Sequence, residues 1–265
     1  MNGSAQGSAS LQGELWGKNA HDWAAFQEPR QRPLYEEGIR RTGIGPGSSV
    51  LDVGCGSGTF CRLAADAGAA VSGIDASGPS VEIARERVPE GDFRVGDLQF
   101  LPYGDDRFDV VTGFNSFQFA ADVRAALAEA RRVAKPGGRV FMLVWGRQER
   151  AGLLAMLDAL RPLTPPSPPG AVEPFAFSGE GALEELAGAA GLTPREGRYL
   201  EATFTYEDSD ALTRAILASA AGARAIAAAG EAATRQALLE GMRRFRTSSG
   251  AYRIENEWRY LVALA

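Results

Sequence analysis

The sequence contains few of the residues that build metal sites and disulfide frameworks. Its 265 residues include one histidine, His21, and two cysteines, Cys55 and Cys61. Two nearby cysteines without further partners fit neither a disulfide framework nor a zinc-ligand spacing, so we expect both to be reduced thiols in a reducing compartment. With a single histidine and no cysteine cluster, no metal site is expected.

The sequence also lacks an excess of positive charge and a long apolar run. It has 28 Lys and Arg against 33 Asp and Glu, a formal net charge of -5. Binding along a nucleic-acid backbone needs a basic face, so no nucleic-acid partner is expected. No stretch approaches the roughly 20 apolar residues of a membrane-spanning helix. Residues 1–10 lack the basic and apolar regions of a signal peptide. We therefore expect a flexible tail at 1–10 and a cytoplasmic protein without membrane contact.

The chain does contain enough apolar residues, 45%, for one large α/β domain or a domain with a cap. Residues 11–45 predict a helical cap of two short helices, with a break at Pro29 and Pro33. Residues 46–147 alternate short apolar runs with helical segments, which is typical of a parallel sheet covered by helices on both faces. The runs at 108–114 and 139–145 are almost continuously apolar and predict central strands.

Residues 148–265 predict the rest of the sheet and a helical insertion. The proline-rich stretch 161–174 predicts a surface loop that holds no helix. A helix is expected near 181–190, and strands are expected at 195–208 and 251–265. Residues of about 208–246 are mostly helix formers and predict a helical lid over the edge of the sheet.

The sharpest motif is VLDVGCGSGTF at 50–60, in which a strand containing Asp52 leads to three glycines and then a helix. Glycine suits a turn with positive φ and lets a ligand approach the backbone, and the helix that follows offers free N–H groups. Dinucleotide-binding folds space their glycines G-x-G-x-x-G. Here position 59 is threonine and the third glycine is Gly58. The G-x-G-x-G spacing favours another ligand, and an NAD-dependent oxidoreductase is the less favoured alternative.

The glycine motif resembles motif I of the class I S-adenosylmethionine (SAM)-dependent methyltransferases, and further motifs follow in the order of that family. Asp75 ends the next predicted strand, 21 residues after Gly54, near the offset at which an acid binds ribose hydroxyls. In the adenine segment of the family, Asp97 would accept from the exocyclic amine and Leu98 would offer its amide to the ring. The resemblance covers about 35–147 and is strongest to the type-11, ubiquinone-biosynthesis-like small-molecule group.

The resemblance implies a Rossmann-like, seven-stranded, mostly parallel sheet with an N-terminal helical cap, a SAM-binding core at 46–147 and a helical lid insertion. It implies transfer of a methyl group from SAM to O, N or C of a small organic acceptor, with S-adenosylhomocysteine (SAH) as product. A SAM-binding protein that catalyses another reaction stays open as an alternative. The expected cofactor-binding residues are Asp52, Gly54, Cys55, Gly56, Gly58, Asp75, Ala76, Asp97, Leu98, Phe114 and Asn115.

Whether a catalytic base is needed depends on the acceptor. An amine needs only to be presented in its neutral form, whereas a hydroxyl needs a base to take its proton. His21, between Trp16 and Trp23, is the candidate base for a hydroxyl. Competing candidates for the pocket wall are Glu28, Tyr35, Asn115, Gln118 and Trp145. Aromatic residues of the C-terminal part are consistent with an apolar acceptor, namely Phe175, Phe177, Phe204, Tyr206 and Phe245. The acceptor and the oligomeric state do not follow from the sequence.

Overall fold

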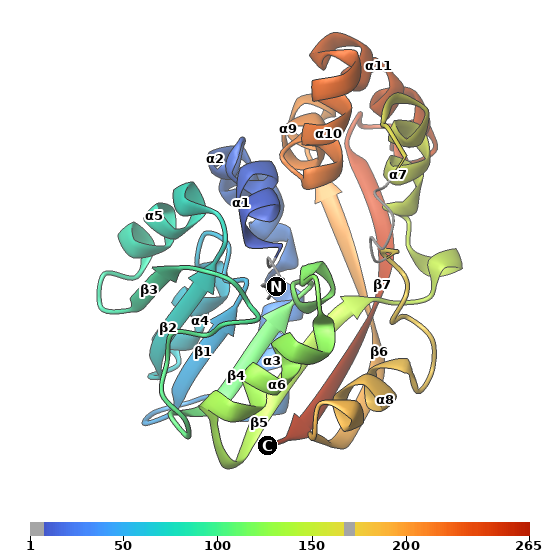
Figure 1. Cartoon of the computed structure of the whole chain (residues 1–265). Helices are drawn as coiled ribbons and strands as arrows, with labels where there is room; N and C mark the ends of the chain where they lie inside the picture. The colour runs from blue at the N-terminus through green and yellow to red at the C-terminus, as the bar shows by residue number, and fades with distance from the viewer. Residues whose placement is uncertain (1–7, 167–172) are drawn as a thin grey trace, which may run out of the picture.

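The computed structural model describes residues 8–166 and 173–265, so the start of the predicted tail and part of the proline-rich stretch lie outside the described residues. Within these residues one sheet of seven strands has the order β3-β2-β1-β4-β5-β7-β6 (Figure 1). Only β7 runs antiparallel to its neighbours, which confirms the predicted mostly parallel sheet. The strands are β1 (Ser49–Val53), β2 (Ala70–Asp75), β3 (Asp92–Val95), β4 (Phe108–Phe114), β5 (Ala134–Trp145), β6 (Thr193–Tyr206) and β7 (Tyr252–Leu264).

Helices cover both faces of the sheet, as predicted. The first face packs against α3 (Arg32–Thr42), α4 (Thr59–Asp66) and α5 (Gly78–Arg87). The second face packs against α6 (Val123–Val133) and α8 (Ala182–Ala189). Helix α6 buries Ala126, Leu127 and Ala130 at helical spacing, and the Asp122 side chain caps its first turn by accepting from the Ala125 N–H at 3.0 Å. The central position of β4 follows from its nearly unbroken apolar sequence.

The N-terminal segment is more continuously helical than the sequence predicts. Helix α1 (Ala9–Gly17) begins inside the expected tail, and α2 (Ala20–Asp22) follows. A π-helical turn η1 (Trp23–Gln27) and a 3₁₀ turn η2 (Glu28–Gln31) then connect to α3. The prolines do not break the segment, because each lies in the first turn of η2 or α3, where no intrahelical N–H is needed. In Figure 1 α1 and α2 lie between α5 and the C-terminal helices α9 and α10.

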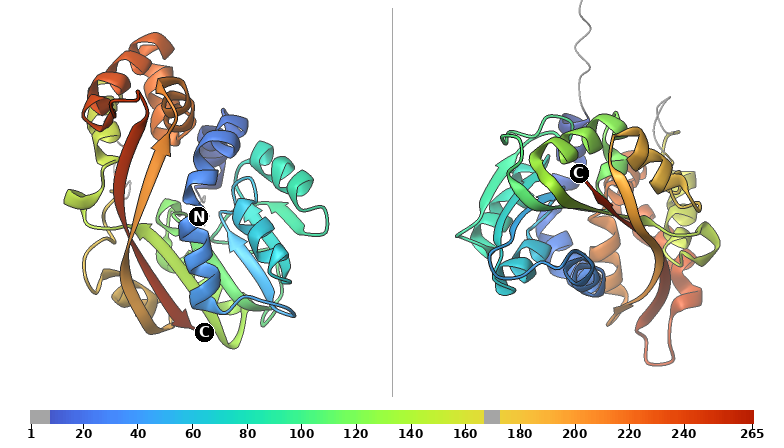
Figure 2. Two further views of the ribbon diagram at one scale, coloured as in Figure 1. Left: turned by 180° about the vertical axis from the view of Figure 1, so that it is seen from behind. Right: turned by 90° about the horizontal axis from the view of Figure 1, so that it is seen from below.

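The C-terminal part extends the sheet beyond the other strands. Strand β7 pairs with β5 only from Trp258 onward, whereas Tyr252 to Glu257 pair with β6 alone. The far ends of this ribbon, seen in Figure 2, are joined by α9 (Ser209–Leu217), α10 (Ala220–Ala229), α11 (Glu231–Met242) and η6 (Arg243–Phe245). These helices fall within the predicted insertion and pack against α7 (Leu154–Leu160) and the N-terminal segment.

Two further short turns flank α7, namely η4 (Gln148–Arg150) and η5 (Arg161–Leu163). The prediction of a stretch without helix is therefore wrong at its first residues, because Pro162 occupies the start of η5, where its fixed φ is compatible with helix. Among the described residues no single helix is long and apolar enough to cross a membrane. Helices α9 and α10 reach that length and apolar character only when taken together, and the chain bends by 93° between them.

Candidate functional site

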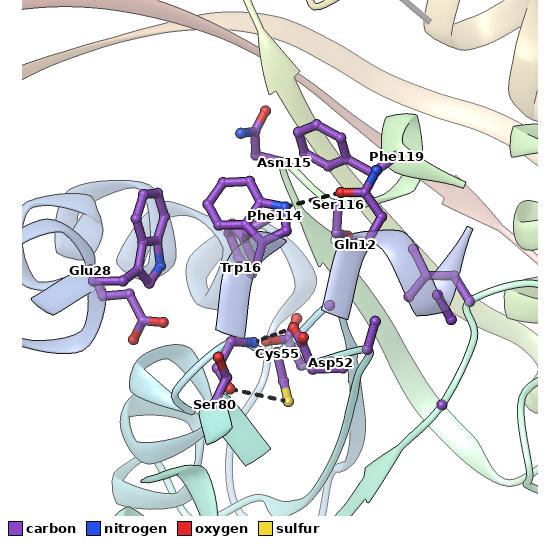
Figure 3. A pocket seen from close by; sticks show the side chains of 18 of the residues that line it. Gln12, Trp16, Glu28, Asp52, Cys55, Ser80, Phe114, Asn115, Ser116 and Phe119 are labelled. Atoms are coloured by element: carbon purple, nitrogen blue, oxygen red, sulfur yellow. Dashed lines mark hydrogen bonds between the residues drawn. The ribbon is translucent and has the colours of Figure 1, made fainter. Parts of the chain in front are cut away.

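A cavity of about 110 Å³ lies where β1, β2 and β4 end. In the sheet, β2 and β3 lie on one side of β1, and β4 and β5 lie on its other side. Such a switch in strand order opens a crevice at the carboxyl ends of the strands, where open α/β sheets bind ligands. The cavity is closed from above by the N-terminal segment, which contributes Gln12, Trp16 and Glu28 (Figure 3).

All but one of the predicted cofactor-binding residues line this cavity. They are Asp52, Gly54, Cys55, Gly56, Asp75, Ala76, Asp97, Leu98, Phe114 and Asn115. Gly58 does not line it. Its φ of +77° requires glycine, and a Cβ there would lie 2.9 Å from the Cβ of Ala84 in α5. Gly58 therefore allows α4 and α5 to pack closely, and the expected contact with a cofactor is not supported by its position.

The glycine-rich turn is held against β2 by its own amides. The N–H groups of Gly54 and Cys55 both donate to the carbonyl of Ile74, at 2.7 and 3.0 Å. Gly54 has a φ of +79°, and a Cβ there would overlap Ser116 at the end of β4. The turn is thus fixed between two strand ends before any ligand binds.

Asp75 is oriented by two backbone amides. Its Oδ2 accepts from Gly56 N–H at 2.9 Å and its Oδ1 accepts from Ser77 N–H at 2.8 Å. Burial raises the pKa of Asp75, and these two hydrogen bonds oppose the rise. Each carboxylate oxygen keeps a further lone pair, so Asp75 is able to accept from two ligand hydroxyls as well.

Asp97 is bound to the helix that covers the cavity. Its Oδ1 accepts from Gln99 N–H at 2.8 Å, and its Oδ2 accepts from Ala9 N–H, the first residue of α1, at 3.2 Å. Helix α1 lies so close that a Cβ at Gly13 would overlap the carbonyl of Ala76. A cavity of about 150 Å³ accommodates only a molecule the size of benzene. A nucleoside ligand therefore requires α1 to move away from Asp97.

Asp52 is the acid most affected by its surroundings. It is 2% exposed and its Oδ1 accepts from the Thr112 hydroxyl at 2.7 Å. Burial raises the pKa of Asp52 to about 7, and the nearby carboxylates of Asp75 and Glu28 contribute to the rise. The buried acids Asp52 and Glu28 thus line the same cavity as Asp75. The carboxylates of these three residues would stabilise a cation bound among them.

The N-terminal segment adds residues that the sequence did not single out as cofactor ligands. Trp16 lies edge-on to Trp23 with ring centroids 4.8 Å apart, and Phe119 of the 3₁₀ turn η3 (Phe117–Phe119) lies 5.8 Å from Trp16. The other cavity residues outside the predicted cofactor set are Ser8, Ala9, Gln12, Glu28, Gln31, Tyr35, Ser80, Gly96 and Ser116. In the sequence, the feature that could have indicated a contact between this segment and the cavity was the presence of Trp16 and Trp23 on either side of His21.

Tyr35 and Asn115, named as candidates for the pocket wall, do line the cavity. The Tyr35 hydroxyl donates to Gln31 at 3.2 Å, and burial raises the pKa of Tyr35. Asn115 has a φ of +54°, a left-handed conformation that asparagine adopts more readily than most residues other than glycine. Its side-chain oxygen accepts from the amide of Gln118, which does not line the cavity itself.

Several other candidates lie elsewhere. His21 is exposed in α2 and does not line the cavity. Trp145 stacks on Trp258, with ring centroids 4.3 Å apart, and is also outside it. The aromatic residues expected to face an acceptor are absent from the cavity lining as well. Phe204 and Tyr206 are buried in the core of the first face, and Phe245 packs against it. Phe177 packs against the core of the second face, and the ring centroid of Phe175 lies 5.9 Å from that of Trp145. Both cysteines are free and buried.

Comparison with known protein families bears on the region that contains the glycine-rich turn. Residues 51–142 match the family model described as a methyltransferase domain. This region of the chain is therefore similar to methyltransferase domains. The chain is 41% identical over 116 residues to a demethylmenaquinone methyltransferase of Renibacterium salmoninarum, covering 44% of the chain and 48% of the relative. It is 33% identical over 169 residues to a 27-O-demethylrifamycin SV methyltransferase of Amycolatopsis mediterranei, covering 58% and 61%.

A similarity in fold to solved structures extends over most of the chain. The crystal structure of the YcgJ protein of Bacillus subtilis superposes with a TM-score of 0.60 at 20% identity, covering 88% of this chain and 98% of YcgJ. The chain spans about half the length of the first curated relatives that it matches. In the part of the chain that the structure describes, no group of three or more His, Cys, Asp or Glu is arranged to hold a metal ion.

Proposed function

We propose that the protein transfers a methyl group from SAM to a small organic acceptor. The observation that carries the proposal is the gathering of Asp75, Asp97 and the glycine-rich turn around one cavity at the switch point of the sheet. Two relatives that share this region are named as methyltransferases of small molecules, which supports a small acceptor here.

The cavity residues fit the chemical groups of SAM. Asp75 would accept from both ribose hydroxyls. Asp97 would accept from the exocyclic amine of adenine once the Ala9 amide leaves it, and Leu98 would offer its backbone amide to the ring. The cavity lining contains four acids and, among the described residues, no lysine, arginine or histidine. This charge balance suits a ligand that carries a sulfonium and an ammonium group.

When bound, SAM supplies a methyl carbon that its sulfonium already makes electrophilic. The protein is then required mainly to orient the acceptor and exclude water. The N-terminal segment is suited to that task, because Trp16, Trp23 and Phe119 bring an apolar wall over the cavity. These residues, rather than the aromatics of the C-terminal part, are proposed to contact an apolar acceptor.

Calorimetry with SAM, SAH and NAD tests the cofactor. We expect SAM and SAH to bind and NAD to show no measurable binding. Binding of NAD without binding of SAM would overturn the proposal.

Transfer is then tested by mass spectrometry, with methyl-labelled SAM and a panel of small hydroxyl, amine and carbon acceptors, including an extract of the source cells. Appearance of label in a small molecule supports methyl transfer. Binding of SAM with no label in any product, in protein that binds SAM stoichiometrically, would favour the alternative of a SAM-binding protein with another activity.

A further inference from the structure

Glu28 is an enclosed acid that reaches from the N-terminal segment to the glycine-rich turn. It is 2% exposed. Its Oε1 accepts from Ser57 N–H at 2.8 Å, and its Oε2 accepts from the Thr59 hydroxyl at 2.5 Å and from the Ser57 hydroxyl. Arg87 of α5 approaches the same Oε2 at 3.2 Å and also donates to the carbonyl of Ser57 at 2.8 Å. Every polar atom of the Glu28 carboxylate is therefore partnered within the protein.

The second glycine of the motif provides space for this carboxylate. Gly56 has a φ of +52°, and a Cβ there would lie 2.5 Å from Oε1 of Glu28. A side chain at this position would push Glu28 out of the turn. The sequence motif assigns such a glycine to the close approach of a ligand, whereas in this chain the group that approaches is Glu28.

Glu28 occupies the place where related folds hold a phosphate. The N-terminus of a helix after the first strand presents free amides and the positive end of the helix dipole, and dinucleotide folds place the pyrophosphate there. Here that helix is α4. The amide of Gly56 donates to Asp75 and the amide of Ser57 donates to Glu28. Two carboxylates of the chain thus accept from two successive amides of the turn, which a phosphate would otherwise contact.

We propose that Glu28 is a specificity-determining residue that fills the anion site of the glycine-rich turn and thereby excludes phosphate-bearing cofactors. A phosphate group brought to the turn would find the amides of Gly56 and Ser57 already bonded and would face a buried negative charge. The adenosine-binding acids stay available for a donor without phosphate. This inference rests on the proposed function, because it explains how the site selects SAM over nucleotides that share its adenosine.

Removing Glu28 should expose a site for an anion. In Glu28→Ala the Ser57 amide, the hydroxyls of Ser57 and Thr59 and the guanidinium of Arg87 would remain with no carboxylate among them. We expect calorimetry to show that this variant binds pyrophosphate and ADP at least about tenfold more tightly than the wild-type protein does. Pyrophosphate should also raise the melting temperature of the variant and leave that of the wild type unchanged.

Asp52→Asn is the matched control. Measured at about pH 8, above the pKa of about 7 to which burial raises Asp52, it removes one negative charge from the same cavity, but Asp52 contacts Thr112 and none of the amides of the turn. Its affinity for pyrophosphate should therefore change by less than about threefold. An equal gain in Asp52→Asn and Glu28→Ala would overturn the proposal, since net charge alone would then explain it. No gain in a folded Glu28→Ala would overturn it as well.

Glu28→Gln keeps the test decisive if the alanine variant does not fold. Glutamine has the same size and retains an acceptor for the Ser57 amide, so the turn is expected to keep its shape. Without the negative charge, the affinity for ADP should rise by about threefold or more, and an unchanged affinity would contradict the proposal. Binding of SAM to the wild-type protein is measured separately, so failure of the proposed function and failure of the role of Glu28 give different results.

Discussion

The buried carboxyl group of Asp52 should make the ligand-free protein less stable at mildly alkaline pH than at mildly acidic pH. Asp52 is 2% exposed, and the structure gives its carboxylate one side-chain hydrogen bond, from Thr112. Burial raises its pKa from 3.8 to about 7. The folded state therefore holds a proton on Asp52 at pH values where the unfolded chain has lost it.

The sign and size of the effect follow from this difference in proton binding. A group whose pKa is raised by folding contributes stability that is fully present below its unfolded pKa and is lost as the pH rises through its folded pKa. Each pKa unit corresponds to about 1.4 kcal/mol. Between about pH 5 and pH 8 the free energy of unfolding should therefore fall by roughly 2–3 kcal/mol because of Asp52. The pKa of Asp75 is also raised by burial, so that residue contributes in the same direction.

Denaturant unfolding at both ends of this range measures the effect. In Asp52→Asn the fall in stability with pH should be smaller than in the wild type by the 2–3 kcal/mol estimated above. Asp109→Asn is the control, because hydrogen bonds from Lys135 and Ser49 lower the pKa of Asp109 to about 2, so its titration lies below the range. A wild-type pH dependence that persists unchanged in Asp52→Asn would refute the reasoning.

Three further predictions concern the cofactor site. Asp75→Ala should weaken SAM binding by about tenfold or more, since charge-assisted hydrogen bonds contribute roughly 1.5–3 kcal/mol; an unchanged dissociation constant in the folded variant would remove Asp75 from the site. Gly13→Ala should make both association and dissociation of SAH faster in stopped-flow tryptophan fluorescence, because the new Cβ overlaps the carbonyl of Ala76 and keeps α1 from closing over the cavity. Gly188→Ala is the control, because a Cβ added there meets open space. Equal rates in both variants would contradict a covering role of α1. His21→Gln should lower turnover by less than about tenfold, because the exposed imidazole lies outside the cavity; a loss of about 10² or more with unchanged SAM affinity would restore His21 as a base.

The core of the fold could be predicted because its signals are local. Strands buried on both faces need nearly continuous apolar sequence, and the turns between them need glycine, so β1, β2, β4 and β5 are visible in the sequence itself. The strands alone did not assign the acids that follow them, and it was the order of the methyltransferase-like motifs that predicted Asp75 and Asp97 to bind one ligand. Their positions around one cavity agree with that expectation.

The covering of the cavity could not be predicted, because it depends on contacts between residues far apart in the chain. The hydrogen bond from Ala9 to Asp97 joins residues 88 positions apart, and no pattern within α1 indicates it. His21 and Trp16 belong to the same short helical segment, yet only Trp16 faces the cavity. Apolar and polar residues alternate in the second half of β6, which indicates that one side of this strand is buried. The alternation does not indicate whether a ligand or α9 covers that side.

The three glycines of the motif show how a local pattern encodes tertiary structure. Each has a positive φ, and each would bring a Cβ into a different part of the molecule: Gly54 into the end of β4, Gly56 into the carboxylate of Glu28 and Gly58 into α5. A spacing that is read as an adaptation to a ligand is here required by three packing partners. The ligand then takes the space and the hydrogen-bonding groups that those partners leave. Because Glu28 uses the amide of Ser57, what remains is a cavity lined by acids, and our proposal for Glu28 makes an element outside the glycine motif responsible for the choice of cofactor.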